Sequence, residues 1–148
     1  MPVTLQHLDQ TRWAQDFQAR HDLVRIYQDA DPDKLAPDAV ESFIARHLRA
    51  GNGFACALFN ARRLGAVAIT PAADGTWQLG ALCVRRTTRG RGVATRLLAL
   101  VADEVARSTH PRLAVASASS AEGRLLTGLG YAVTHDGDVR VGAAGGIS

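Results

Sequence analysis

The stretch LGALCVRRTTRGRGVA at residues 79–94 joins an apolar run to a loop rich in arginine and glycine. Beyond the loop an apolar residue recurs every four positions, at Val93, Leu97, Val101 and Val105, and this spacing predicts a helix of about four turns. A helix N-terminus holds anions, because its first N–H groups are unpaired and its dipole end is positive. Glycine lets the backbone approach a phosphate closely, and arginine adds charge-assisted hydrogen bonds. We therefore predict a phosphorylated ligand at the helix start beside Gly92.

The spacing within this loop excludes two common phosphate-binding motifs. It lacks the Gly-Lys-Ser/Thr ending of a P-loop, and it is not GxGxxG because Thr95 stands at the third glycine position. What remains is Arg-x-x-Gly-x-Ala at 89–94, between a predicted strand and a predicted helix. The alternative interpretation is an arginine- and glycine-rich turn that connects the two elements and holds no ligand.

The patterns on either side of the loop predict a mixed α/β layer fold. One apolar face that includes Trp13, Phe17 and Tyr27 predicts a helix capped by Asp9 or Thr11. Short apolar or alternating runs predict strands at 3–8, 54–59, 64–70, 76–84 and 112–117, and a closing hairpin over 131–141. Further helices are predicted over 37–50 and 122–129. We expect a single domain over 1–148, with a frayed tail at 142–148.

The composition is that of a globular protein, since 47% of residues are apolar and 21% are charged. No apolar run approaches the roughly 20 residues that span a bilayer. The start, residues 1–5, lacks a signal-peptide pattern, so we expect a cytoplasmic protein with no membrane partner. The net charge of +3 comes from 16 arginines and one lysine, and 5% of residues are aromatic. A nucleic-acid-binding face interleaves basic residues with aromatics, so we expect no nucleic-acid partner.

The two cysteines, Cys56 and Cys83, lie in apolar stretches of the sequence. Neither belongs to a cysteine or histidine spacing that binds metal, so no metal site is predicted. We expect two buried free thiols, because free cysteine behaves as a small apolar side chain. A catalytic Cys83 is the alternative.

The loop and its surroundings resemble the acetyl-CoA site of the GCN5-related N-acetyltransferases (GNATs). The resemblance rests on Arg-x-x-Gly-x-Ala at 89–94, on the apolar strand that ends at Val84, and on LGY at 129–131. It implies the GNAT fold and binding of acetyl-CoA or CoA, with the pantetheine arm between the strand ending at Val84 and the strand at 112–117. A nearby N–H would polarise the thioester carbonyl, as acyl transfer requires. The implied cofactor-binding residues are Leu82, Cys83, Val84, Arg89, Gly90, Arg91, Gly92, Val93, Ala94 and Thr95.

The resemblance leaves the catalytic residues unassigned. Many GNATs carry a tyrosine acid in a pattern like F-Y-x-x-L-G-F, which falls on 125–131 here and puts Leu126 at the tyrosine position. No carboxylate that could act as a base occurs between Gln78 and Thr88. The substitutes that the sequence offers are Tyr27, Asp31, His110 and Tyr131, and water is a further proton relay. Whether the chain is an enzyme is therefore left open.

With these departures, the chain resembles one branch of the GNATs, the PanZ (PanM) acetyl-CoA sensors. DLVRIY at 22–27, LFNARRL at 58–64 and LCVRRTTRGRGV at 82–93 are similar to that family's motifs, although Leu58 and Gly90 replace two of its arginines. The resemblance implies a sensor that binds and regulates aspartate 1-decarboxylase, with partner contacts at Asn60, Arg85 and Arg86. The alternative is a catalytic N-acetyltransferase that moves acetyl from acetyl-CoA to an amine of a small molecule or protein.

Overall fold

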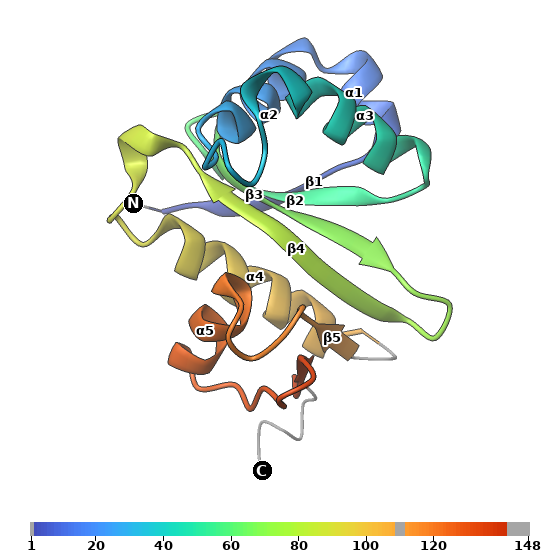
Figure 1. Ribbon diagram of the computed structural model, residues 1–148, viewed down its shortest axis with the longest axis vertical. Coiled ribbons are helices and arrows are strands. Elements are labelled where there is room, and N and C mark those ends of the chain that lie inside the picture. The colour runs from blue at the N-terminus through green and yellow to red at the C-terminus, as the bar shows by residue number, and fades with distance from the viewer. Residues whose placement is uncertain (1, 109–111, 142–148) are drawn as a thin grey trace.

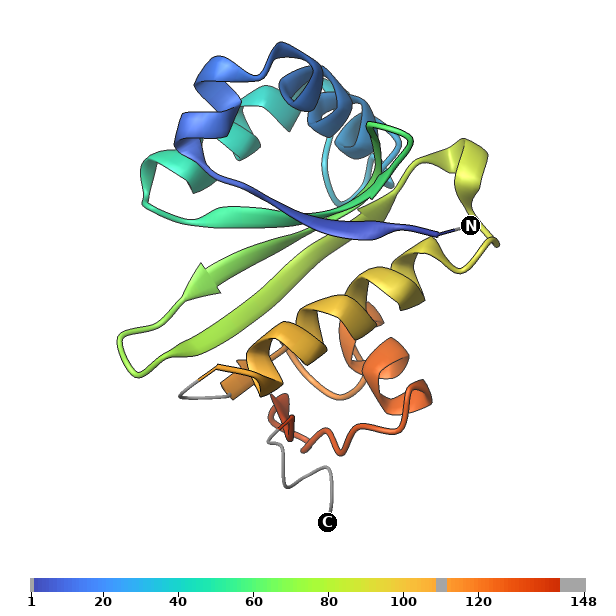
Figure 2. The ribbon, with the colours of Figure 1, turned by 180° about the vertical axis from the view of Figure 1, so that it is seen from behind.

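The computed structural model describes residues 2–108 and 112–141, and this part of the chain forms a mixed β-sheet with helices on both faces (Figure 1). The strands stand in the order β1 (Thr4–Leu8), β2 (Gly53–Phe59), β3 (Arg62–Pro71), β4 (Thr76–Val84), β5 (Arg112–Ala114) and β6 (Asp138–Val139). One face carries α1 (Gln10–Gln15), α2 (Phe17–Gln28) and α3 (Val40–Arg49), and the other carries α4 (Val93–Ala106) and α5 (Ala121–Gly128), as Figure 2 also shows. The α/β fold predicted from the sequence is confirmed.

The central strands are buried on both faces of the sheet. In β2, Ala55 and Ala57 belong to the apolar cluster that includes α4, whereas Phe54 and Cys56 belong to the cluster that includes α2 and α3. This burial explains why 54–59 is a continuous apolar run rather than an alternating one. Cys56 and Cys83 are buried and free, as predicted. Within the described residues, no helix is long and apolar enough to cross a membrane.

The first helical region consists of two helices rather than the one predicted. Asp16 separates them with an extended backbone, and its side chain accepts a hydrogen bond from the Ala19 amide as the N-cap of α2. Because the break rotates α2 relative to α1, Phe17 does not join the buried face and is 84% exposed. The prediction for Phe17 was therefore wrong. Asp9 caps α1, which is one of the two predicted caps.

The turn between β2 and β3 is tighter than the predicted four-residue connection. Asn60 and Ala61 alone form it, with φ of 50° and 64°. Two left-handed residues in succession are the requirement of a type I′ hairpin turn, which matches the twist of the flanking strands. The two following arginines, Arg62 and Arg63, therefore belong to β3.

The C-terminal half of β4 has no partner from β5. The two strands run parallel, and only Thr76–Gln78 of β4 pairs with β5, because β5 ends at Ala114 and not at 117 as predicted. The separation implied by the sequence resemblance is present beyond Gln78. The predicted closing hairpin is reduced to β6, paired with β5, and one bridge between Val133 and Val139. The predicted tail at 142–148 lies outside the described residues.

A buried carboxylate binds α2 to the β2–β3 hairpin. The Asp22 side chain is 1% exposed and accepts hydrogen bonds from the Arg62 side chain at 2.8 and 2.9 Å. Its other oxygen accepts from the Arg63 amide at 3.1 Å and the Arg63 guanidinium at 3.3 Å. Burial acts to raise the pKa of Asp22, but the hydrogen bonds from Arg62, the Arg63 amide and Gln18 outweigh it and lower that pKa.

Asp22→Asn is expected to destabilise the fold by roughly 3 kcal/mol, because it removes the buried charge that pairs with the Arg63 guanidinium at 3.3 Å and leaves that guanidinium with the more exposed Asp16 at 3.5 Å. The measurement is urea unfolding, with the exposed Asp38→Asn as the matched control, expected to change stability by less than about 0.5 kcal/mol. Because the pKa of Asp22 is lowered in the folded state, its contribution is present above the ordinary aspartate pKa. That contribution is lost as the pH falls through the folded pKa, and the Asn variant should lack this part of the acid dependence. If Asp22→Asn and Asp38→Asn are equally stable, Asp22 does not hold α2 to the β2–β3 hairpin.

Candidate functional site

The loop that follows β4 gives the N-terminus of α4 an open backbone. Gly90 and Gly92 have φ of 80° and 79°, in the left-handed region that favours glycine, and Gly92 is the N-cap of α4. No described side chain caps this helix, so no side chain competes for the amides of its first turn. A Cβ added at Gly92 meets nothing within 4 Å. The backbone at this point therefore fits an anionic group such as a pyrophosphate.

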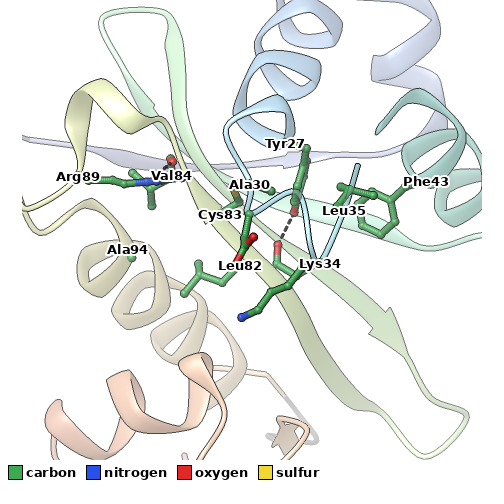
Figure 3. A pocket seen from close by; sticks show the side chains of 12 residues that line it. Tyr27, Ala30, Lys34, Leu35, Phe43, Leu82, Cys83, Val84, Arg89 and Ala94 are labelled. Atoms are coloured by element: carbon green, nitrogen blue, oxygen red, sulfur yellow. Dashed lines mark hydrogen bonds between the residues drawn. The ribbon is translucent and has the colours of Figure 1, made fainter. Parts of the chain in front are cut away.

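Two loop arginines, Arg85 and Arg89, donate hydrogen bonds to Asp29 at the end of α2. Arg89 donates from Nε to the Val84 carbonyl at 3.1 Å, which Figure 3 marks, and from a terminal nitrogen to the Asp29 carbonyl at 2.6 Å. Arg85 donates to the Asp29 carboxylate at 3.0 Å, and the Arg86 amide donates to the same oxygen at 2.9 Å. Burial acts to raise the pKa of Asp29, but these bonds from Arg86 and Arg85 outweigh it and lower that pKa.

Asp29 is therefore a residue that sequence reasoning missed. It fixes the start of the loop on α2, and the Arg89 guanidinium donates to the backbone carbonyls of Val84 and Asp29. Arg91 is exposed on the loop. The alternating acidic residues after α2 gave no signal of this contact, which joins residues 56 to 60 positions apart.

Strand β4 bends where it leaves β5. Ala81 has φ of 50°, and the register between β3 and β4 shifts at this point. The Tyr27 hydroxyl of α2 donates to the Ala81 carbonyl at 2.7 Å (Figure 3). Burial raises the pKa of Tyr27 well above its usual value, so this side chain stays a neutral hydrogen-bond donor. Both ends of the DLVRIY segment, Asp22 and Tyr27, thus bind the sheet.

A buried carboxylate occupies the opposite face of the bend. Glu122 lies in the first turn of α5, is 7% exposed, and accepts a hydrogen bond from the Leu82 amide at 3.0 Å. The search for a base between Gln78 and Thr88 missed it, because the contact spans 40 positions. The available signal was Ser120, the N-cap of α5, followed by an acidic residue in the first turn.

A cavity of about 570 Å³ lies between the end of α2, the loop that follows it and the bend of β4. Tyr27, Asp31, Lys34 and Phe43 line it from the helical side, as Figure 3 shows in part. Leu82, Cys83, Val84, Arg89 and Ala94 line it from β4 and α4. The structure therefore brings five of the predicted cofactor-binding residues together with two of the substitute catalytic residues.

The other candidates lie elsewhere. Tyr131 packs against the apolar cluster on the α4 face, and Leu126, at the tyrosine position of the GNAT pattern, is fully buried. His110 lies outside the described residues. The Cys83 thiol donates to the Ile26 carbonyl at 3.2 Å, and burial raises its pKa, which makes it a weak nucleophile. Asn60, Arg85 and Arg86 lie at one end of the sheet, since the Arg85 amide donates to Leu64 beside the Asn60 turn.

A protein-family model matches most of the chain. The model described as the PanZ acetyltransferase (GNAT) domain matches residues 2–138. The chain belongs to this family. No curated protein sequence matches it.

Solved structures similar to this PanZ-family chain are GNAT proteins. Aminoglycoside 6'-acetyltransferase type Ii has a TM-score of 0.66 at 15% identity, over 92% of this chain and 93% of that one, which supports the fold alone. The N-acetyl transferase YhhK from E. coli, solved bound to coenzyme A, has a TM-score of 0.57 at 26% identity over 95% and 98%. The ribosomal-protein-S18-alanine N-acetyltransferase from Escherichia coli has a TM-score of 0.60 at 18% identity over 93% and 88%.

Glu122→Ala is expected to destabilise the protein by about 1 kcal/mol or more, because the partly buried Leu82 amide loses its acceptor. The measurement is urea unfolding of the purified protein. The matched control is Glu104→Ala, which removes the exposed contact between Glu104 and His7 and is expected to cost less than about 1 kcal/mol. If both variants lose the same stability, Glu122 does not hold the bend of β4.

Proposed function

We propose that the chain binds acetyl-CoA or CoA at the loop before α4 and along the open edge of β4, and acts as an acetyl-CoA sensor. In that role it binds and regulates aspartate 1-decarboxylase in the cytoplasm, as its resemblance to the PanZ sensors implies. The observation that carries the ligand assignment is the uncapped N-terminus of α4, set beside a strand edge that β5 leaves open, in a chain of the PanZ GNAT family.

The proposed ligand would contact backbone groups more than side chains. The pyrophosphate would lie at the amides of Val93, Ala94 and Thr95, beside the glycines at 90 and 92, with Arg91 adding positive charge. The pantetheine arm would follow Leu82, Cys83 and Val84 along the strand edge. A coenzyme A-bound solved structure at 26% identity supports this ligand class. Acetyl-CoA supplies a thioester, and a carbonyl of the ligand would replace Glu122 as the acceptor for the Leu82 amide.

The acid and base groups near β4 are poorly suited to catalysis, and this favours the sensor role. Leu126 provides no hydroxyl at the position where many GNATs carry a tyrosine. Tyr27 is committed to the Ala81 carbonyl, and its pKa is raised well above its usual value. Asp31 is the substitute that remains at the cavity, and it already accepts a hydrogen bond from the Asp33 amide. General acid–base help for an external amine is therefore poor.

Catalytic N-acetyl transfer to an external amine is the second candidate. The cavity of about 570 Å³ next to Leu82 and Ala94 is the observation that favours it, because an acceptor could enter from that side. Thiol release from acetyl-CoA, measured with and without a panel of small amines and peptides, separates the two roles. Tight binding without amine-dependent thiol release supports the sensor, whereas rapid release supports the enzyme.

The partner surface is proposed at the β2–β3 turn and the end of β4. Asn60 is exposed on a two-residue turn that Asp22 holds in place through Arg62 and Arg63. The Arg85 guanidinium pairs with Asp29, so Arg86, which is exposed, offers the more available charge beside it. A rigid turn of this kind presents its side chain at little entropic cost on binding.

Gly92→Asp is expected to weaken binding of acetyl-CoA and of CoA at least about tenfold, because a carboxylate would stand beside the pyrophosphate. Isothermal titration calorimetry measures both affinities. Gly51→Asp is the matched control, because Gly51 has a similar φ of 88° and also has nothing within 4 Å of an added Cβ, yet lies at the end of α3. Unchanged affinity in Gly92→Asp would show that the ligand lies elsewhere.

Asn60→Gly is expected to weaken binding of purified aspartate 1-decarboxylase at least about tenfold in the presence of acetyl-CoA. Glycine keeps the left-handed turn and removes only the side chain, so the affinity for acetyl-CoA should not change. Ala73→Gly, in the exposed turn between β3 and β4, serves as the control. Co-sedimentation or surface plasmon resonance gives the comparison. If the native protein does not bind the decarboxylase with acetyl-CoA present, this partner is wrong.

A further inference from the structure

We propose that Lys34 accepts the acetyl group within the same chain, so that the protein acetylates itself at this residue. The inference rests on the proposed acetyl-CoA site and assigns the cavity beside it a second role. Lys34 is the one lysine in the sequence. It lines the same cavity as Leu82, Val84 and Ala94, which belong to the proposed ligand site.

The backbone around Lys34 forms an ordered turn between α2 and the following helical turn (Pro37–Ala39). The amides of Lys34 and Leu35 donate to the Asp31 carbonyl at 2.9 and 3.0 Å. The Asp33 amide donates to the Asp31 carboxylate at 3.0 Å. Figure 3 shows the Lys34 side chain extending along the cavity toward Leu82. Lys34 thus lines the cavity from an ordered turn, and the residue itself is exposed.

The other nucleophiles that line the cavity are engaged. The Tyr27 hydroxyl donates to Ala81, and burial raises its pKa well above its usual value. The Cys83 thiol donates to Ile26, and burial raises its pKa also. The Arg89 guanidinium donates to two backbone carbonyls. The Lys34 amine is thus the nucleophile best placed to attack a thioester held at Leu82.

Placement in the same molecule compensates for weak acid and base groups. An amine held beside a bound thioester reacts at a high effective concentration, which an external amine in dilute solution does not reach. The Lys34 ammonium first releases a proton to solvent. Its Nζ then forms an amide bond to the acetyl carbonyl carbon while the bond from that carbon to sulfur breaks. The nitrogen loses a second proton, and the CoA thiolate takes up one proton to leave as the thiol. The products are acetyl-Lys34 and free CoA.

The test is incubation of the purified full chain with acetyl-CoA, followed by intact mass spectrometry and peptide mapping. One acetyl group per chain is expected, and it should map to Lys34 rather than to the N-terminal amine. Lys34→Arg should abolish the modification while retaining calorimetric binding of acetyl-CoA. Gly92→Asp retains the lysine and should slow the modification at least about tenfold, because the thioester is no longer held beside it.

Acetic anhydride, which needs no binding site, provides the control for accessibility and should label Lys34 equally in the native protein and in Gly92→Asp. Calorimetric binding of acetyl-CoA without any acetyl group on Lys34 would overturn this inference and leave the proposed ligand site intact. Equal rates of modification in the native protein and in Gly92→Asp would show simple solution acetylation and overturn it as well. Absence of acetyl-CoA binding would overturn the proposed function together with the inference.

Discussion

Strands β4 and β5 separate after Gln78, and this separation determines which backbone groups the neighbouring helices must satisfy. A strand that loses its neighbour leaves amides and carbonyls unpaired, and those that are partly buried are stabilised by other hydrogen-bond partners. Here two side chains supply them from opposite faces of the sheet, Tyr27 to the Ala81 carbonyl and Glu122 to the Leu82 amide. The backbone groups at the proposed ligand-binding edge of β4 therefore have hydrogen-bond partners that a ligand would replace.

Helix α2 is the element that connects the proposed ligand site to the proposed partner surface. Asp22, in the middle of the helix, holds the arginines that follow the Asn60 turn, and Tyr27, near its end, holds the bend of β4. Asp29, directly after the helix, fixes the loop that leads to α4. Because all three contacts come from one short segment, the positions of the loop, the bend and the hairpin turn are set together.

Local patterns in the sequence predicted the sheet, the strand–loop–helix unit at 79–106 and the buried cysteines, because each depends on residues close in the chain. They did not predict the break at Asp16, where a capping side chain overrides a continuous apolar face. They also missed the contact of Glu122 with Leu82 and that of Arg89 with Asp29, which join residues 40 and 60 positions apart. Such contacts follow from the topology of the sheet, which periodicity alone does not reveal.

The conformation of Ala81 has a consequence for the energetics of recognition. A non-glycine residue at φ of 50° is uncommon, and it persists only where surrounding contacts determine the backbone. The free-energy cost of this strain falls on folding, so the bent strand edge is already in place before any ligand binds. Binding then need not order this backbone, and more of the interaction energy is retained as affinity. A glycine at this position would relax the strain, but its backbone would be freer, and ordering that backbone would then cost entropy on binding.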